Sequence, residues 1–193
     1  MEKVSAAAIS CFGGAAVSIN HPRGNQAARG TKAMLDGPSV VAALQECGVT
    51  HVVWIPDSDL GRWDAALSSA PALTLVRVCR EAEAFAIAAG LWLGGKKQIV
   101  MVQCTGLFDA GDALRNVLHD MGLPLLVLVG VRNLLAHERG QTADTCPKFT
   151  EPIVRAWGLP MHRLDEREPA RSLATALNQG DSFRQALVIL YPE

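Results

Sequence analysis

The sequence predicts an α/β fold, a doubly wound, mainly parallel six-stranded sheet with helices on both faces. Segments typical of strands and of helices alternate about six times along the 193 residues. Residues 125–131 are apolar at successive positions, which is typical of a strand covered on both faces. Aromatic residues are only 5% of a chain that is 49% hydrophobic, and small side chains let helices lie close to a sheet.

The regular pattern begins at Asp36. We predict a helix over 36–47, with Asp36 or Ser39 as its N-cap and Gly48 as its end. The next segments predict, in order, a strand at 51–55, a short helix at 60–69, a strand at 73–78 and a helix at 81–94. The last of these is apolar on most sides, which indicates a largely buried helix.

The second half continues the alternation. It predicts a strand at 98–103, a helical region at 108–121, a strand at 125–131, a loop at 132–146, a helix at 149–157, a strand at 161–164, a helix at 169–178 and a strand at 186–191. The loop at 132–146 is long enough to suggest a functional role. Residues 1–33 show no sustained period, so we expect an N-terminal extension, either flexible or a docking arm, ahead of one domain over 34–193.

Composition excludes several classes of protein. The 18 basic and 19 acidic side chains are not clustered, which argues against a nucleic-acid or membrane surface. The longest apolar run, 123–131, is about half of the ~20 residues that a membrane helix needs. Neighbouring cysteines are at least 25 residues apart and the five histidines are scattered, so we expect no metal site. The odd number of cysteines fits a reducing cytoplasm.

Ligands of such sheets bind beyond the carboxyl ends of the strands. No Walker loop, dinucleotide-binding glycine motif or nucleophile elbow occurs there. Residues 94–97, Gly-Gly-Lys-Lys, could suit a phosphate, but they follow a predicted helix and we interpret them as its end. Cys104 has no base beside it in sequence, and we interpret it as a buried thiol at a strand end.

Glu81 stands on the first turn of the helix predicted at 81–94. One interpretation is a carboxylate that complements the positive end of the helix dipole. The other is a functional group at the carboxyl edge of the sheet. Glu83 lies about 200° further around the helix, so the two carboxylates cannot act on one group, and we expect Glu83 to pair or to face solvent.

Four segments in order resemble the pyrimidine-binding (PYR) domain of thiamine diphosphate enzymes. They are Glu81 with Gly90 nine residues later, and the segments 48–58, 103–115 and 122–130. Within this family the segments resemble the sulfopyruvate and phosphonopyruvate decarboxylases, and the resemblance covers residues 36–193. It implies that Glu81 is catalytic: it would bond the aminopyrimidine and favour the imino tautomer that removes the C2 proton.

The resemblance also implies further contacts. Gln103, Thr105 and Gly106 would bind the cofactor, although Cys-Thr-Gly-Leu here replaces the Gly-Pro-Gly of many relatives. Asp57 and Ser58 would face the substrate, unless they only cap a turn. In the loop 132–146, Arg132 and His137 would meet an anionic substrate tail, unless they are solvated loop residues.

Relatives hold the diphosphate through Mg²⁺ on a second domain marked by Gly-Asp-Gly. Here Gly111-Asp112-Ala113 and Gly180-Asp181-Ser182 lack that setting. The resemblance therefore implies a β (PP-domain) partner subunit that holds Mg²⁺, in a hetero-oligomer that converts sulfopyruvate to sulfoacetaldehyde and CO₂. Phosphonopyruvate decarboxylation, another thiamine-dependent lyase or carboligase reaction, and a non-catalytic regulatory or scaffolding role are the alternatives.

Overall fold

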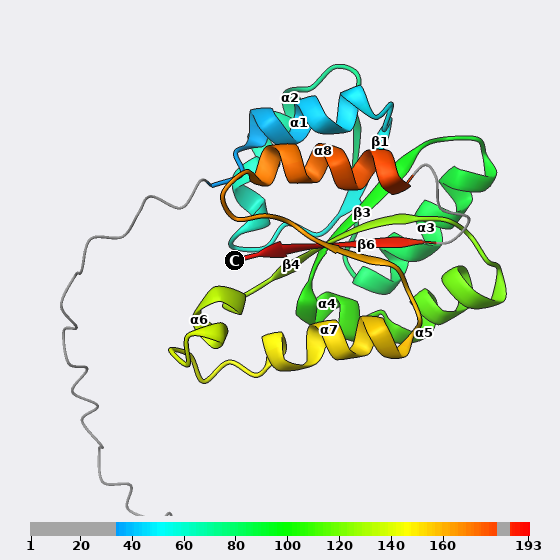
Figure 1. The fold of residues 1–193 in the computed structure, drawn as a ribbon. Helices are drawn as coiled ribbons and strands as arrows, with labels where there is room; N and C mark the ends of the chain where they lie inside the picture. The colour runs from blue at the N-terminus through cyan, green and yellow to red at the C-terminus, as the bar shows by residue number, and fades with distance from the viewer. Residues whose placement is uncertain (1–33, 181–185) are drawn as a thin grey trace, which may run out of the picture. The chain divides into compact units, whose positions relative to one another are not determined.

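The computed structural model describes residues 34–180 and 186–193, so the extension predicted at 1–33 lies outside it. Six strands form one sheet in the order β2-β1-β3-β4-β6-β5, and each neighbouring pair is parallel. Helices cover both faces (Figure 1). The predicted α/β fold with a parallel six-stranded sheet is therefore confirmed.

The first half follows the predicted boundaries closely. Its elements are α1 (Gly37–Glu46), β1 (His51–Trp54), η1 (Leu60–Trp63), α2 (Asp64–Ser69), β2 (Thr74–Arg77) and α3 (Glu81–Leu93). Asp36 is the N-cap of α1, and its side chain accepts a hydrogen bond of 2.8 Å from the backbone N–H of Ser39. Gly48 has a φ of +69° just past the helix, a conformation that favours glycine.

The second half differs from the prediction at three places. Its elements are β3 (Gln98–Gln103), α4 (Cys104–Asp109), α5 (Gly111–Arg115), η2 (Asn116–Asp120), β4 (Leu126–Val131), α6 (Leu134–Glu138), α7 (Cys146–Ala156), β5 (Met161–Arg163), α8 (Pro169–Gly180) and β6 (Leu187–Pro192). The helical region begins at Cys104 rather than at 108, because Gln103 keeps extended backbone and α4 follows it directly. The segment 132–146 is not all loop, because α6 forms there and buries two leucines. The helix predicted at 149–157 is α7, which begins at Cys146.

Alternate residues of the strands pack into two hydrophobic cores on opposite faces of the sheet. The core under α1, α2 and α8 takes the even-numbered residues of β1 and β4, and that under α3, α4, α5 and α7 takes the odd-numbered ones. For example, Leu128 is fully buried in the first core and Val129 in the second. This alternation is the geometry of a strand covered on both faces, and it explains why β4 carries apolar residues without a break.

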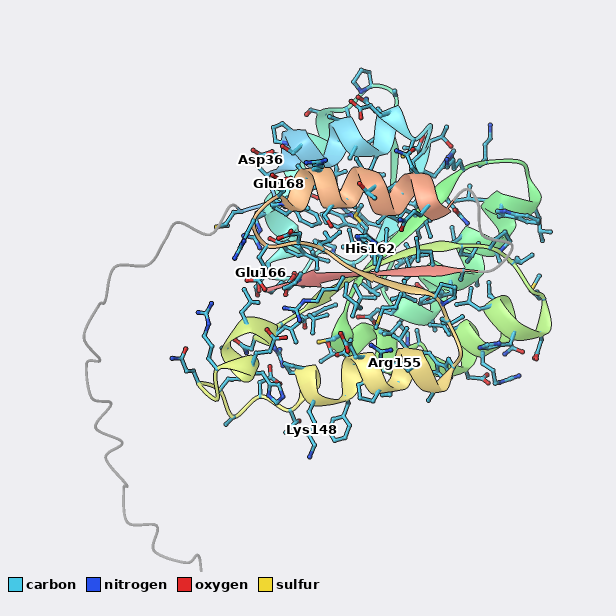
Figure 2. All side chains as sticks on the ribbon, in the orientation of Figure 1. Asp36, Lys148, Arg155, His162, Glu166 and Glu168 are labelled. Carbon is cyan, nitrogen blue, oxygen red and sulfur yellow. The ribbon has the colours of Figure 1, made fainter. Side chains whose placement is uncertain are left out.

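The carboxyl ends of all six strands meet at one edge of the sheet. The turn at 56–59, the N-terminal ends of α3 and α4, and Glu193 after β6 all lie there. Asp36 and Glu168, labelled in Figure 2, stand at the N-terminal ends of α1 and α8 on the side of the molecule where the chain ends. No helix in the described ranges is long and apolar enough to cross a bilayer.

The central position of β4 yields a stability prediction. Leu128→Ala removes a fully buried side chain, so we expect the free energy of unfolding to fall by about 2–5 kcal/mol. Leu93→Ala, the same substitution at a leucine that is 63% exposed, should change it by less than about 0.5 kcal/mol. Chemical denaturation of both variants checks this, and equal losses would contradict the placement of the two leucines.

Candidate functional site

The side chain of Glu81 lies against Gly106. Glu81 is the first residue of α3 and is half-buried, and Arg80 before it has extended backbone. A Cβ on Gly106 would overlap Cγ, Cδ and Oε1 of Glu81. Gly106 therefore provides the space for this side chain. Within the described residues the Glu81 carboxylate forms no hydrogen bond or ion pair, so it is available to a ligand.

Gln103 and Thr105 stand beside this contact. The Thr105 hydroxyl donates a hydrogen bond of 3.1 Å to Oε1 of Gln103, which orients the amide. Gln103 pairs in register with Gly130 of β4, so the neighbouring position carries no side chain. The structure thus brings four of the predicted residues, Glu81, Gln103, Thr105 and Gly106, to the N-terminal turn of α4.

Glu83 has a different role from Glu81. It is exposed, and its Oε2 accepts a hydrogen bond of 3.2 Å from the backbone N–H of Cys79. This hydrogen bond stabilises the turn that precedes α3. Glu83 is thus both paired and facing solvent, as expected.

Arg132 is held by Asp144. Its Nε donates to Oδ2 of Asp144 at 2.8 Å, and Asn133 and the backbone N–H of Cys146 each donate to the same carboxylate at 3.0 Å. These bonds, the one from Arg132 first, hold the pKa of Asp144 well below its ordinary value. His137 lies half-buried on α6, and in the described ranges no hydrogen bond joins it to the Glu81 group.

Asp57 caps the turn after β1. Its Oδ1 accepts two hydrogen bonds of 2.7 Å, from the backbone N–H groups of Asp59 and Leu60. Its Oδ2 is buried and has no hydrogen-bond partner in the described part of the chain. Ser58 is exposed between the two aspartates. Of the pair predicted to face substrate, Asp57 therefore acts as a cap and Ser58 is the accessible group.

Glu193, which belongs to no sequence motif, also lies at this edge. Both its carboxyl oxygens are buried, and no donor group in the described ranges hydrogen-bonds to them. A Cβ on Gly130 would overlap Oε1, so this carboxyl fills the space that the glycine leaves. Its position just after the last strand, at the edge where ligands bind, is the only sequence signal that points to it.

Glu193 keeps its proton at neutral pH. Burial, followed by the nearby carboxylates of Asp57 and Asp59, raises its pKa to about 8, and Arg62 opposes this only in part. When protonated, Glu193 has a hydroxyl to donate to Asp59, a hydrogen bond that the ionised form cannot make.

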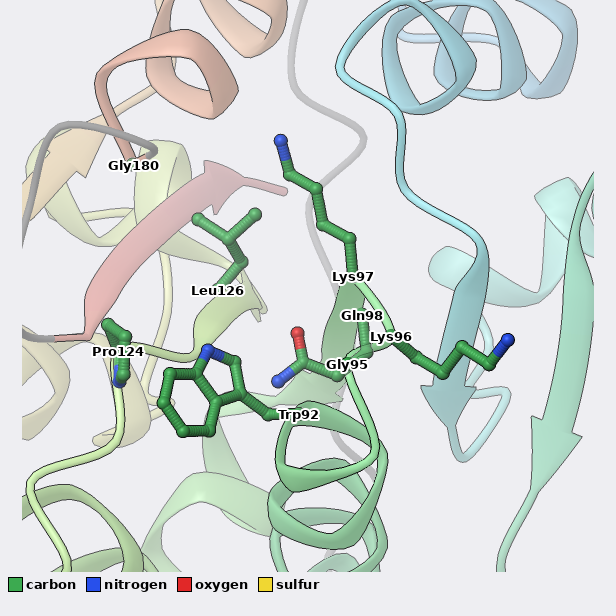
Figure 3. Close-up of a pocket in the computed structure, with 8 residues that line it drawn as sticks. All are labelled: Trp92, Gly95, Lys96, Lys97, Gln98, Pro124, Leu126 and Gly180. Atoms are coloured by element: carbon green, nitrogen blue, oxygen red, sulfur yellow. The ribbon is translucent and has the colours of Figure 1, made fainter.

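A cavity of about 410 Å³ lies at the other end of the sheet, between the turn after α3 and the starts of β3 and β4. Figure 3 shows Trp92 and Gln98 in its wall, with Lys96 and Lys97 pointing away from the indole ring. It contains none of the predicted site residues, so it is separate from the Glu81 group. Among residues 34–180 and 186–193, no group of three or more His, Cys, Asp or Glu side chains could hold a metal ion.

Comparison with known families tests the resemblance. Residues 37–149 match the thiamine pyrophosphate enzyme family, N-terminal TPP binding domain. The chain belongs to this family. The match includes the Glu81 group, and it confirms the resemblance noted from the four ordered segments.

The chain is similar to named decarboxylases. It is 36% identical over 153 residues to phosphonopyruvate decarboxylase of Streptomyces viridochromogenes, covering 70% of this chain and 38% of that protein. It is 28% identical over 94 residues to sulfopyruvate decarboxylase subunit alpha of Methanothermobacter thermautotrophicus, covering 49% and 57%. The Methanocaldococcus jannaschii subunit alpha is 23% identical over 135 residues, covering 70% and 79%. The chain thus spans well under half of the Streptomyces relative's length.

A solved structure shows the same fold at low identity. The 2-oxoglutarate:ferredoxin oxidoreductase of Magnetococcus marinus superposes with a TM-score of 0.54 at 14% identity, over 82% of this chain and 29% of that one.

The residues present fit the aminopyrimidine of thiamine diphosphate. A ring nitrogen needs a carboxyl at hydrogen-bond distance, and Glu81 offers one with no partner in the described residues. The missing Cβ of Gly106 leaves room for that carboxyl, and Gln103 offers an oriented amide nearby.

The raised pKa of Glu193 generates a prediction on stability. The unfolded chain releases this proton near pH 4.5, while the folded chain keeps it up to about pH 8. Glu193 therefore contributes stability below about pH 4.5 that is lost as the pH rises to about 8. We expect Glu193→Gln to become more stable relative to the wild type across this range, with a gain in Tm of more than about 3 °C at pH 8 over that at pH 5.

Chemical and thermal denaturation at pH 5, 6.5 and 8 measure this difference. Glu46→Gln, at an exposed glutamate on α1, is the matched control and should follow the wild type at every pH. A constant difference between Glu193→Gln and the wild type over these pH values would contradict the prediction.

Proposed function

We propose that this chain supplies the cofactor-activating half of a thiamine diphosphate-dependent decarboxylase, the α (PYR) subunit, acting on a small 2-oxo acid with an anionic tail. The observation that carries the proposal is Glu81. It is a half-buried carboxylate against Gly106, without a partner in the described residues, in a TPP binding domain. Sulfopyruvate, converted to sulfoacetaldehyde and CO₂, is the proposed substrate, and the names of the archaeal relatives support it.

The chain's own residues prepare the cofactor. When bound, thiamine diphosphate supplies a C2 carbanion and an electron sink for decarboxylation. Glu81 would hold a proton between its carboxyl and the pyrimidine ring nitrogen, and its partial burial strengthens that hydrogen bond relative to water. Gln103 accepts from Thr105 through Oε1, which leaves its Nε2–H groups to donate to the ring edge. Gly106 lets the carboxyl reach this position.

The proposed substrate contacts lie around this group. Ser58, the exposed hydroxyl of the turn after β1, would bind the substrate carboxylate, with Asp57 holding the turn in shape. Arg132 uses Nε for Asp144 and Nη2 for the sulfur of Cys146, so its Nη1 would face the anionic tail together with His137. These assignments separate positioning residues (Asp57, Asp144) from residues that touch the substrate.

A second subunit would complete the site. We propose a β (PP-domain) partner that holds Mg²⁺ and the diphosphate in a cytoplasmic hetero-oligomer; the word subunit in the names of the archaeal relatives supports this. The helix that begins at Glu81 has an exposed apolar stripe, Ala86, Ile87, Gly90 and Leu93. Exposed apolar faces of this kind mark interaction surfaces, and this one lies on the helix whose first residue is Glu81.

Phosphonopyruvate is the second candidate substrate. The 36% identity to phosphonopyruvate decarboxylase favours it, although that match covers 38% of the relative. Both substrates are 2-oxo acids with an anionic tail, so the same contacts would serve either one. Product analysis with both acids, and with a second carbonyl compound to detect carboligation, distinguishes these reactions.

Replacing Glu81 tests the proposed function. Glu81→Gln should lower kcat for CO₂ release from sulfopyruvate by at least about 100-fold, because an amide cannot hold the proton at the ring nitrogen. The assay contains thiamine diphosphate, Mg²⁺ and a co-expressed β subunit that carries Gly-Asp-Gly. Glu83→Gln, two residues along the same helix, is the matched control and should keep most of the activity, because its amide oxygen still accepts from Cys79.

Circular dichroism and Tm establish that both variants fold. Near-wild-type turnover by Glu81→Gln contradicts the catalytic role of Glu81. Absence of turnover by the wild-type complex with every 2-oxo acid favours the regulatory or scaffolding alternative instead.

The apolar stripe on α3 predicts the partner surface. Ile87→Glu places a charge in the middle of the stripe, and burying an unpaired charge is costly. We expect at least a tenfold weaker Kd for the β subunit, measured by calorimetry or sedimentation, with an unchanged Tm of the isolated chain. Thr175→Glu, at an exposed position on α8 across the sheet, is the control. An unchanged Kd for Ile87→Glu would show that the partner binds elsewhere.

A further inference from the structure

Two cysteines meet beside the proposed cofactor site. Cys104 is the first residue of α4 and Cys146 the first residue of α7, and these two helices pack together on one face of the sheet (Figure 1). Cys104 belongs to the buried hydrophobic cluster on this face, Cys146 packs against the same cluster, and the two side chains interact. Both are free cysteines, 42 residues apart in sequence.

The two thiols differ in surroundings. Cys104 is fully buried, and this burial raises the pKa of its thiol to about 11. Cys146 is partly exposed, and Nη2 of Arg132 lies 3.7 Å from its sulfur. Cys146 is therefore the thiol that an oxidant reaches, and Cys104 is the one that lies behind it.

We propose that Cys104 and Cys146 form a reversible disulfide that switches the α4 side of the site. With a peroxide as oxidant, the Cys146 thiolate attacks one peroxide oxygen, the O–O bond breaks, and the departing oxygen leaves as water after protonation. The resulting sulfenic acid on Cys146 is attacked by the sulfur of Cys104; the S–O bond breaks, a second water leaves and the S–S bond forms. Two thiols are oxidised and one peroxide is reduced to two waters. A small dithiol reverses the reaction.

The disulfide would move the residues that support Glu81. A disulfide holds the two sulfurs about 2.05 Å apart and restricts the separation of the two Cα atoms, so we expect the first turn of α4 to shift toward α7. Cys104 lies between Gln103 and Thr105, and Gly106 belongs to the same turn. Oxidation therefore displaces the surface on which the Glu81 side chain packs. This consequence for activity rests on the proposed function, whereas disulfide formation does not.

Peptide mapping tests the disulfide directly. The full-length chain is treated with hydrogen peroxide, blocked with iodoacetamide and digested with trypsin without reduction. We expect residues 98–115, which hold Cys104, to be linked to residues 140–148, which hold Cys146, and dithiothreitol to separate them. Cys47→Ser, which changes a buried cysteine on the opposite face, is the control and should give the same linked pair.

The single variants test the order of events. Cys104→Ser should accumulate a sulfenic acid at residue 146, which dimedone labels, because the second thiol is missing. Cys146→Ser should form neither the linked pair nor a dimedone adduct at residue 104. Absence of the linked pair in the wild type, or preferential labelling of Cys104, overturns the proposal.

The functional consequence has its own measurement. In complex with the β subunit, each protein is compared with its own untreated activity. The wild type and Cys47→Ser should lose at least 90% of turnover as the linked pair forms and should recover it with dithiothreitol. Cys146→Ser should show no such reversible loss of turnover. Full turnover in a completely linked wild type would overturn the switch while leaving the proposed function intact. If the untreated, reduced complex is inactive although peroxide still produces the linked pair, the result counts against the proposed function alone.

Discussion

Parallel pairing is the constraint on which the site depends. Because all six strands point the same way, the segments that follow them arrive at one edge of the sheet, whatever their distance in sequence. Glu81 and Glu193 are 112 residues apart, yet both reach this edge, and each is accommodated by a glycine. Gly106 makes room for the first carboxyl and Gly130 for the second. A side chain at either glycine would expel a carboxyl group, so the two glycines shape the edge as much as the charged residues do.

The two glutamates differ because their surroundings differ. Glu81 is half-buried at a helix N-terminus, where the dipole favours a negative charge and no described side chain satisfies it. Glu193 is packed beside Asp57 and Asp59, with Arg62 as a counter-charge, and burial raises its pKa to about 8. Its proton keeps one negative charge off this edge at neutral pH. If Glu193 were ionised, it would add a third carboxylate beside Asp57 and Asp59, and an anionic substrate would be repelled more strongly.

Periodicity predicted all six strands and most helices. The four inner strands, β1, β3, β4 and β6, are buried on both faces and therefore apolar, and α1 ends at a recognisable residue, Gly48. The position of Glu81 after a strand left two interpretations open, and only the resemblance of the four ordered segments favoured the catalytic one. The fixed position of Arg132 could not be predicted, because its partner Asp144 lies across a loop whose path depends on α6. Glu193 belongs to no motif. Cys104 was correctly interpreted as buried, but its contact with Cys146 depends on the packing of α4 on α7.

The first turn of α4 is the element that these interactions share. Glu81 packs on it against Gly106, Thr105 orients Gln103 from within it, and Cys104 lies in it where α4 packs on α7. The turn is held rigidly, since Leu107 is fully buried and the backbone N–H of Ala110 donates to the carbonyl of Gly106 at 2.9 Å. A helix of six residues with a buried anchor shifts as a unit rather than bending, because closely packed interiors transmit displacement. A displacement of the Cys104 sulfur therefore moves Gly106, two residues away. It also moves the surface against which the carboxyl group of Glu81 packs.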